Sequence, residues 1–153
     1  MIRRVFLASL VFGLVACGDD GQGPDPIACT DDTGSVEVTV TTGASVQFDW
    51  EPACAVALLI VEQEGGGDLW LIGTRTSGST PGFDDPDGVN LITPPVSYGA
   101  APSGVDERNP AETLVAGVTY ALILWRGLPQ NSTAVCQFRS ETACLMVVHE
   151  FVR

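Results

Sequence analysis

Apolar and polar residues alternate with a period of two in the early part of the chain. Residues 36–40 place valine at every second position among glutamate and threonine, and residues 46–50 alternate valine, phenylalanine and tryptophan with glutamine and aspartate. Because successive side chains of a strand point to opposite faces, this pattern predicts two strands that each have one buried and one solvated face.

Four further segments are short, apolar and separated by stretches that contain glycine or proline. They span residues 54–61, 69–76, 118–125 and 145–152. All except 69–76 are apolar on both faces, and their length and β-branched content favour strands over helices. The number and spacing of these strands predict that residues 35–153 form an all-β sandwich of two antiparallel sheets.

One segment of the predicted domain has a more specific pattern. Residues 114–124, Leu-Val-Ala-Gly-Val-Thr-Tyr-Ala-Leu-Ile-Leu, resemble the Leu-x-Pro-Gly-Thr-x-Tyr-x-Val-x-Val segment of fibronectin type III (Fn3) domains. In that family the segment carries the tyrosine corner, with leucine six residues before tyrosine, as Leu114 and Tyr120 are here. Residues 48–52, Phe-Asp-Trp-Glu-Pro, are similar to the segment that holds the family's second-strand tryptophan. The chain departs from the family in lacking the usual proline and threonine around Gly117.

The resemblance implies an Fn3/Ig-like sandwich with a long insertion, roughly residues 77–110, before the tyrosine-corner strand. A fold shared by adhesive, linking and receptor domains does not by itself assign a function. The resemblance also implies that alternate side chains of residues 118–125 point into the core, namely Tyr120, Leu122 and Leu124. The outward side chains are then Ala121, Ile123 and Trp125.

An apolar outward face must be covered by the protein itself or by a partner. We expect the insertion to cover it with its own apolar side chains, Phe83, Leu91, Ile92, Val96 and Tyr98. The alternative is an open binding face that includes Ile123, Trp125 and Trp70.

The start of the chain has the layout of a bacterial export signal. Two arginines precede an uncharged, mostly apolar run over residues 5–15, which is shorter than the ~20 residues of a membrane-spanning helix. The run ends in Leu-Val-Ala-Cys, which resembles the lipobox of bacterial lipoproteins, Leu-x-[Ala/Gly]-Cys. The resemblance implies that residues 1–16 are removed and that Cys17 carries lipid, which anchors the chain to a membrane.

Residues 17–34 are predicted to be a flexible tether, because they are rich in glycine, aspartate and proline and offer little to bury. Gly18 stands where the inner-membrane retention rule for lipoproteins requires aspartate. This favours the outer membrane in a cell that has one, with the domain in the periplasm or at the cell surface.

The chain is strongly acidic. It has 19 aspartates and glutamates against 7 arginines, no lysine, and a formal net charge of −12. Such a surface repels nucleic acid and anionic lipid. We therefore expect no nucleic-acid partner, contact with the membrane only through lipid, and an envelope protein or a glycan as the partner.

The cysteines other than the lipobox residue are even in number, which suits disulfides in an oxidising compartment. Cys136 and Cys144 enclose a short stretch and are predicted to occupy cross-strand positions of one hairpin. Cys29 is then predicted to pair with Cys54. The alternative is a zinc site made by these cysteines and His149, although no two of them have the Cys-x₂₋₄-Cys spacing of such sites.

Residues suited to catalysis are few. His149 is the only histidine and lies among apolar neighbours, and no serine stands in a Gly-x-Ser-x-Gly elbow, so we expect no enzymatic activity and no catalytic residue. Residues 106–110 are expected to form a charged surface loop.

One loop of the insertion gathers oxygen ligands of the kind calcium binds, from Asp84, Asp85, Asp87 and Asn90. The same residue types are common in solvated turns, so we expect no cofactor, with calcium as the alternative.

These features predict a lipid-anchored, non-catalytic protein of the cell envelope with a role in adhesion, assembly or binding. The alternative is a carbohydrate- or calcium-binding module that uses residues 77–110, in which Trp70 and Trp125 could stack on a sugar.

The lipobox predicts that Cys17→Ser abolishes membrane association and leaves the domain folded. The mutant chain should take up no radioactive fatty acid, because the acyl chains are attached through the cysteine sulfur. Equal labelling of the wild-type and mutant chains would contradict lipidation at this residue.

Overall fold

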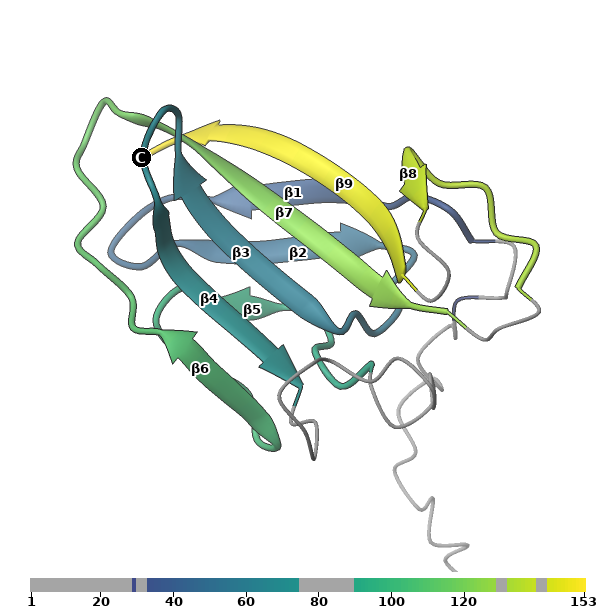
Figure 1. Ribbon diagram of the computed structural model, residues 1–153. Coiled ribbons are helices and arrows are strands. Elements are labelled where there is room, and N and C mark those ends of the chain that lie inside the picture. Colours follow the sequence, from purple (N-terminus) through teal and green to yellow (C-terminus); the bar gives the residue numbers. More distant parts are fainter. Residues whose placement is uncertain (1–28, 30–32, 75–89, 129–131, 140–142) are drawn as a thin grey trace, which may run out of the picture.

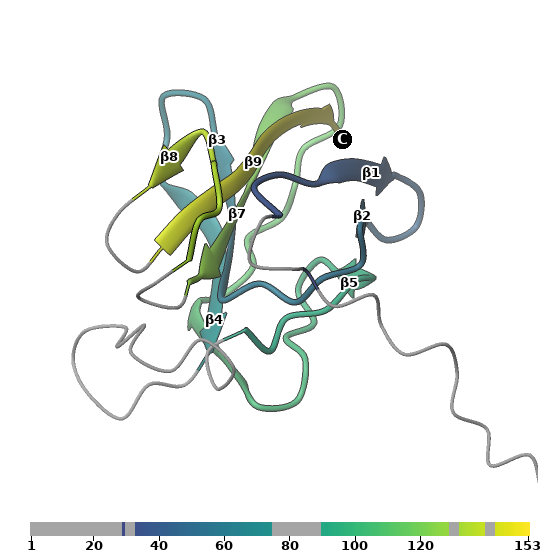
Figure 2. The same cartoon turned by 90° about the vertical axis from the view of Figure 1, so that its right-hand side faces the viewer.

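The computed structural model describes residues 29, 33–74, 90–128, 132–139 and 143–153. Within these residues every regular element is a β-strand, and the strands form two antiparallel sheets that face each other (Figure 1). Figure 2 shows the two layers from the side, with β1, β2 and β5 in one and β3, β4, β7 and β9 in the other. The predicted all-β sandwich is therefore confirmed.

The smaller sheet has three strands in the order β1-β2-β5. Its strands are β1 (Glu37–Thr41), β2 (Gln47–Glu51) and β5 (Val96–Ser97). Phe48 and Trp50 are fully buried between exposed neighbours on β2, as the alternation in the sequence predicts. β5 comes from the insertion and was not evident in the sequence pattern.

The larger sheet has six strands in the order β6-β4-β3-β7-β9-β8. They are β3 (Leu58–Gln63), β4 (Asp68–Thr74), β6 (Val105–Asn109), β7 (Thr119–Gly127), β8 (Phe138–Arg139) and β9 (Ala143–Val152). β7 pairs with β3 on one side and β9 on the other, which places it in the middle of the sheet.

The distribution of strands between the sheets is similar to that of an immunoglobulin sandwich, except for the fourth strand. In that architecture the first, second, fourth and fifth strands oppose the third, sixth and seventh. Here β1, β2 and β5 face β3, β7 and β9, and β4 extends the larger sheet beside β3. The remaining strands, β6 and β8, lie at the two edges of the larger sheet.

Two predicted elements differ from the structure. The strand expected over residues 54–61 begins only at Leu58, because the preceding residues cross from the smaller sheet to the larger one. Within this crossing, Val56 forms an isolated bridge with Ile92 of the insertion. Residues 106–110 were expected to be a loop, but most of them belong to edge strand β6, which pairs with β4.

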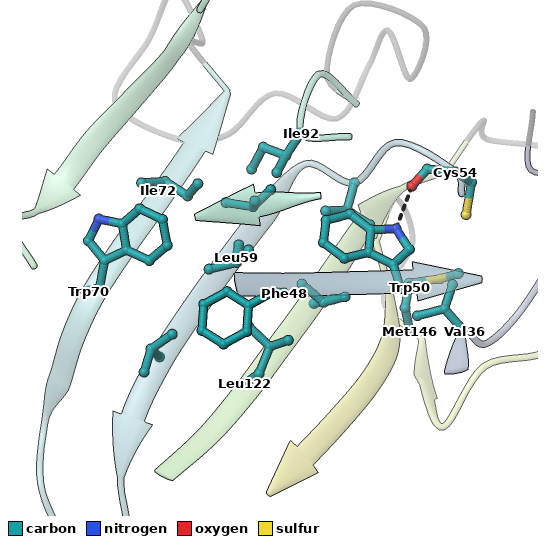
Figure 3. Close-up of a cluster of buried hydrophobic side chains, with 14 of the residues drawn as sticks. Val36, Phe48, Trp50, Cys54, Leu59, Trp70, Ile72, Ile92, Leu122 and Met146 are labelled. Atoms are coloured by element: carbon teal, nitrogen blue, oxygen red, sulfur yellow. Dashed lines mark hydrogen bonds between the residues drawn. The ribbon is translucent and has the colours of Figure 1, made fainter. Parts of the chain in front are cut away.

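Two tryptophans occupy the interior between the sheets (Figure 3). The indole N–H of Trp50 donates to the carbonyl oxygen of Cys54 at 2.8 Å, and that of Trp70 donates to Glu107 Oε1 at 2.8 Å. Each buried ring therefore keeps its one polar group hydrogen-bonded, which avoids the cost of an unsatisfied donor.

Tyr120 forms the predicted corner at the start of β7. Its ring is buried beside Phe151, with ring centroids 5.7 Å apart, and Leu114 packs against the same core. The backbone N–H of Val115 donates to Tyr120 Oη at 2.7 Å. Gly117 supplies the turn between them with a φ of 78°, a conformation that favours glycine.

Both predicted disulfides are present, Cys29–Cys54 and Cys136–Cys144, with Cα–Cα separations of 5.0 and 5.8 Å. The first attaches the end of the predicted tether to the crossing segment that follows β2. The second differs in detail from the prediction, because Cys144 of β9 stands opposite Arg139, and Cys136 lies before β8.

Tyr120→Phe removes only the hydroxyl and should lower the free energy of unfolding by ~1–3 kcal/mol, because the Val115 N–H loses its partner. Tyr120→Ala also removes the buried ring, so we expect a loss of ~3–5 kcal/mol. Urea unfolding with the disulfides intact measures both values. A change below ~0.5 kcal/mol for Tyr120→Phe would show that the corner contributes no more than a surface contact.

Candidate recognition face

The side of the six-stranded sheet that points away from the smaller sheet is here called the outer face, and Figure 1 looks onto it. On β7, Tyr120, Leu122 and Leu124 are buried, whereas the residues between them are partly exposed. The predicted assignment of inward and outward side chains on this strand is thus confirmed. Because residues directly opposite each other in an antiparallel pair share a face, the strand register assigns the neighbours of each outward residue.

The register arranges the outer face in three rows that run across the strands. The aromatic row consists of Leu58, Trp125, Leu145 and Phe138, which stand opposite one another on β3, β7, β9 and β8. The aliphatic row consists of Leu71, Ile60, Ile123 and Val148, on β4, β3, β7 and β9. The acidic row consists of Asp68, Glu62, Ala121 and Glu150 on the same four strands.

Solvent reaches the two apolar rows to different extents. Phe138 is 59% and Val148 is 47% exposed, and the other six side chains of these rows are partly buried. The rings of Trp125 and Phe138 meet edge to face with centroids 5.9 Å apart. The aromatic row thus contains the amphipathic indole of Trp125 in contact with the exposed phenyl ring of Phe138. Aromatic residues of this kind are enriched in protein interfaces.

The smaller sheet presents a very different surface to solvent. The outward residues of β1 and β2 are all polar or acidic and exposed, namely Glu37, Thr39, Thr41, Gln47, Asp49 and Glu51. One side of the sandwich is therefore an ordinary solvated surface, and the opposite side carries two apolar rows.

The described part of the insertion does not cover the outer face, contrary to expectation. Ile92 and Val96 are buried between the sheets. Tyr98 packs edge to face against Phe48 and Trp70, at centroid distances of 6.4 and 5.2 Å. These side chains fill the open side of the sandwich because the smaller sheet has too few strands to cover the interior surface of the larger one. Phe83 lies outside the described residues.

Trp70 does not belong to the outer face, which corrects the predicted binding face of Ile123, Trp125 and Trp70. Its side chain is fully buried on the inner side of β4 and is bonded to Glu107. Trp70 and Trp125 therefore point to opposite sides of one sheet and cannot form a shared platform for a sugar. Ile123 and Trp125 remain together on the outer face.

Of the four candidate calcium ligands, the structure describes Asn90. Asp84, Asp85 and Asp87 lie outside the described residues. The amide of Asn90 pairs with the backbone of Gly127, donating to its carbonyl at 3.0 Å and accepting from its N–H at 2.9 Å. This pairing attaches the insertion to the end of β7. Among the described residues, no group of three or more acidic, histidine or cysteine side chains is arranged to hold a metal.

His149 stands on β9 opposite Leu122 and is partly buried. All four cysteines of the alternative zinc site are used in disulfides, so that site is not formed.

A surface hollow of about 250 Å³ lies beside the tyrosine corner, where Tyr98, Glu112, Leu114 and Arg153 are among its lining residues. Tyr98 Oη donates to the Glu112 carbonyl at 2.8 Å. Burial of the hydroxyl raises the pKa of Tyr98 to about 12.

Comparisons with known proteins return no match to a family model, to a curated protein or to a solved structure. Among the described residues there is no helix long and apolar enough to cross a membrane.

The pKa of Tyr98 is raised in the folded state, so folding favours the neutral hydroxyl. The stability that this preference contributes is complete below pH 10 and is lost as the pH rises towards 12. We expect the wild-type minus Tyr98→Phe difference in tyrosinate absorbance to titrate with a midpoint of about 12. The urea midpoint of the wild type should also fall more steeply than that of Tyr98→Phe over this interval. A difference titration centred near pH 10 would contradict the burial of this hydroxyl.

Proposed function

We propose that this chain is a lipid-anchored, non-catalytic protein of the cell envelope, which contacts a partner through the outer face of its six-stranded sheet. Residues 1–16 direct export, Cys17 carries the lipid, and residues 17–34 hold the domain away from the membrane. The function is adhesion, assembly or binding, with the outer membrane as the favoured site of attachment.

The observation that carries this proposal is the difference between the two outer faces of the sandwich. An antiparallel sheet exposed to water normally has polar residues on its solvated side, as β1 and β2 have here. The larger sheet instead carries eight apolar side chains in two adjacent rows. Contiguous apolar surface of this kind marks an interaction site in soluble domains.

The disulfides agree with export. Two cysteine pairs are bonded within the domain, which is compatible with an extracellular or periplasmic location. The first bond also joins the predicted tether firmly to the sandwich, at Cys54 beside the buried Trp50. The predicted tether is therefore attached to the domain at a fixed point.

A photoreactive amino acid at position 123 tests the proposal in cells that make the chain. Ile123 lies in the middle of the aliphatic row, so we expect ultraviolet light to give discrete cross-linked products from this position. The matched control places the same amino acid at Thr39, an exposed position on the outer side of β1. Identical products from both positions, or none from position 123, would reject the outer face as the contact surface.

A further inference from the structure

One border of the outer face is formed by the acidic row. The acidic row runs next to the aliphatic row, with Glu62 directly opposite Asp68 on β4 and with Glu150 on β9. Asp68 and Glu150 are exposed, and Glu62 is partly buried. Three carboxylates therefore lie along one side of an apolar surface.

The described arginines do not neutralise this border. Arg108 lies at the other end of the outer face, where its guanidinium covers Gly73 beside Leu58 and donates to the Thr74 carbonyl at 3.1 Å. The other described arginines donate to backbone carbonyls elsewhere in the domain. Arg126 donates to the carbonyl of Cys29, and Arg153 donates to the carbonyl of Gly43. Arg139 donates to the carbonyls of Ser132 and Ala134. Among the described residues, no arginine side chain is hydrogen-bonded to the acidic row, so its negative charge can attract a basic partner.

Repulsion between neighbouring carboxylates is not what distinguishes the acidic row, since Glu37 and Glu51 also stand opposite each other on the smaller sheet. The distinguishing feature is position. The Glu37–Glu51 pair is surrounded by polar side chains, whereas the acidic row borders two apolar rows on the same face.

We propose that the outer face binds a protein surface that has an apolar centre and a line of lysine or arginine side chains along one border. The apolar centre packs on Trp125, Ile123 and their neighbours, and the basic border lies along the acidic row. This inference rests on the proposed function and adds the chemistry and orientation of the partner. A second copy of the chain fits less well, because each copy has a net charge of −12 and two such surfaces repel each other. An anionic lipid surface is disfavoured for the same reason.

The test uses a fluorescent amphipathic peptide with leucine and tryptophan on one helical face and lysines along one border of that face. A twin peptide has glutamate in place of every lysine. Each peptide is titrated with the full chain in non-ionic detergent, and anisotropy gives the dissociation constant at several salt concentrations. We expect the lysine peptide to bind more tightly than its twin and to weaken as salt rises.

Two sets of neutralising substitutions locate the effect. The first set, Asp68→Asn, Glu62→Gln and Glu150→Gln, removes the acidic row. The matched control set, Glu37→Gln, Asp49→Asn and Glu51→Gln, removes the same number of carboxylates from the smaller sheet. An exposed ion pair increases affinity by about 1.4- to 5-fold. Because the first set removes three carboxylates, it should raise the dissociation constant of the lysine peptide by at least ~3-fold. The dissociation constant should also depend less on the salt concentration. The control set should leave binding within ~1.5-fold of the wild type, since its carboxylates act only at long range.

Each other outcome overturns the inference. Equal binding of the two peptides, or equal effects of the two sets, would show that the acidic row does not select the partner. A dimer seen by sedimentation velocity and split by Ile123→Ser would assign the outer face to a second copy. Binding of neither peptide would also reject a basic partner, and the cross-linking at position 123 would then decide separately whether the outer face is an interface at all.

Discussion

The antiparallel register of β7 with β3 and β9 is the constraint on which the rest of the structure depends. It places Tyr120, Leu122 and Leu124 towards the smaller sheet, and it places Ile123 and Trp125 on the outer face. A slip by one residue would reverse both sets, because side chains alternate along a strand. The tyrosine corner, the interior and the outer face are therefore consequences of one pairing.

Two local features help to maintain this register. The hydrogen bond from Val115 to Tyr120 Oη holds the turn that leads into β7, and the N–H of Gly117 donates to the Arg153 carbonyl at the end of β9. At the other end of the pair, an irregularity between Leu124 and Trp125 changes the pairing with β9. As a result Met146 is fully buried, while its neighbour Leu145 faces outward beside Trp125. The aromatic row of the outer face depends on this adjustment.

The two sheets are unequal in size, and this inequality explains where the insertion packs. The smaller sheet has three strands and the larger sheet has six, and strand β5 of the smaller sheet is only two residues long. Part of the interior surface of the larger sheet would therefore be open to water without Ile92, Val96 and Tyr98 of the insertion. Burial of these side chains contributes to the core and leaves the described insertion unable to cover the opposite face.

The elements that could be predicted from the sequence are those with local signals. Period-two alternation predicted β1 and β2, apolar runs predicted β3, β4, β7 and β9, and the spacing of Leu114, Gly117 and Tyr120 predicted the corner. The spacing of the cysteines also predicted both disulfides, because one pair encloses a short segment and leaves only one partner for Cys29. The resemblance of residues 14–17 to a lipobox stays a prediction, since these residues lie outside the described part of the chain.

Tertiary structure decided the features that depend on distant neighbours. The edge strands β5, β6 and β8 are short or highly charged, and they exist because a longer strand offers them backbone partners rather than because of their own pattern. Trp70 faces inward because of the register of β4 with β3, which an apolar run of the sequence leaves undetermined. The acidic row exists only in the folded sheet, because Asp68, Glu62 and Glu150 come from three strands that are brought together by non-local hydrogen bonds.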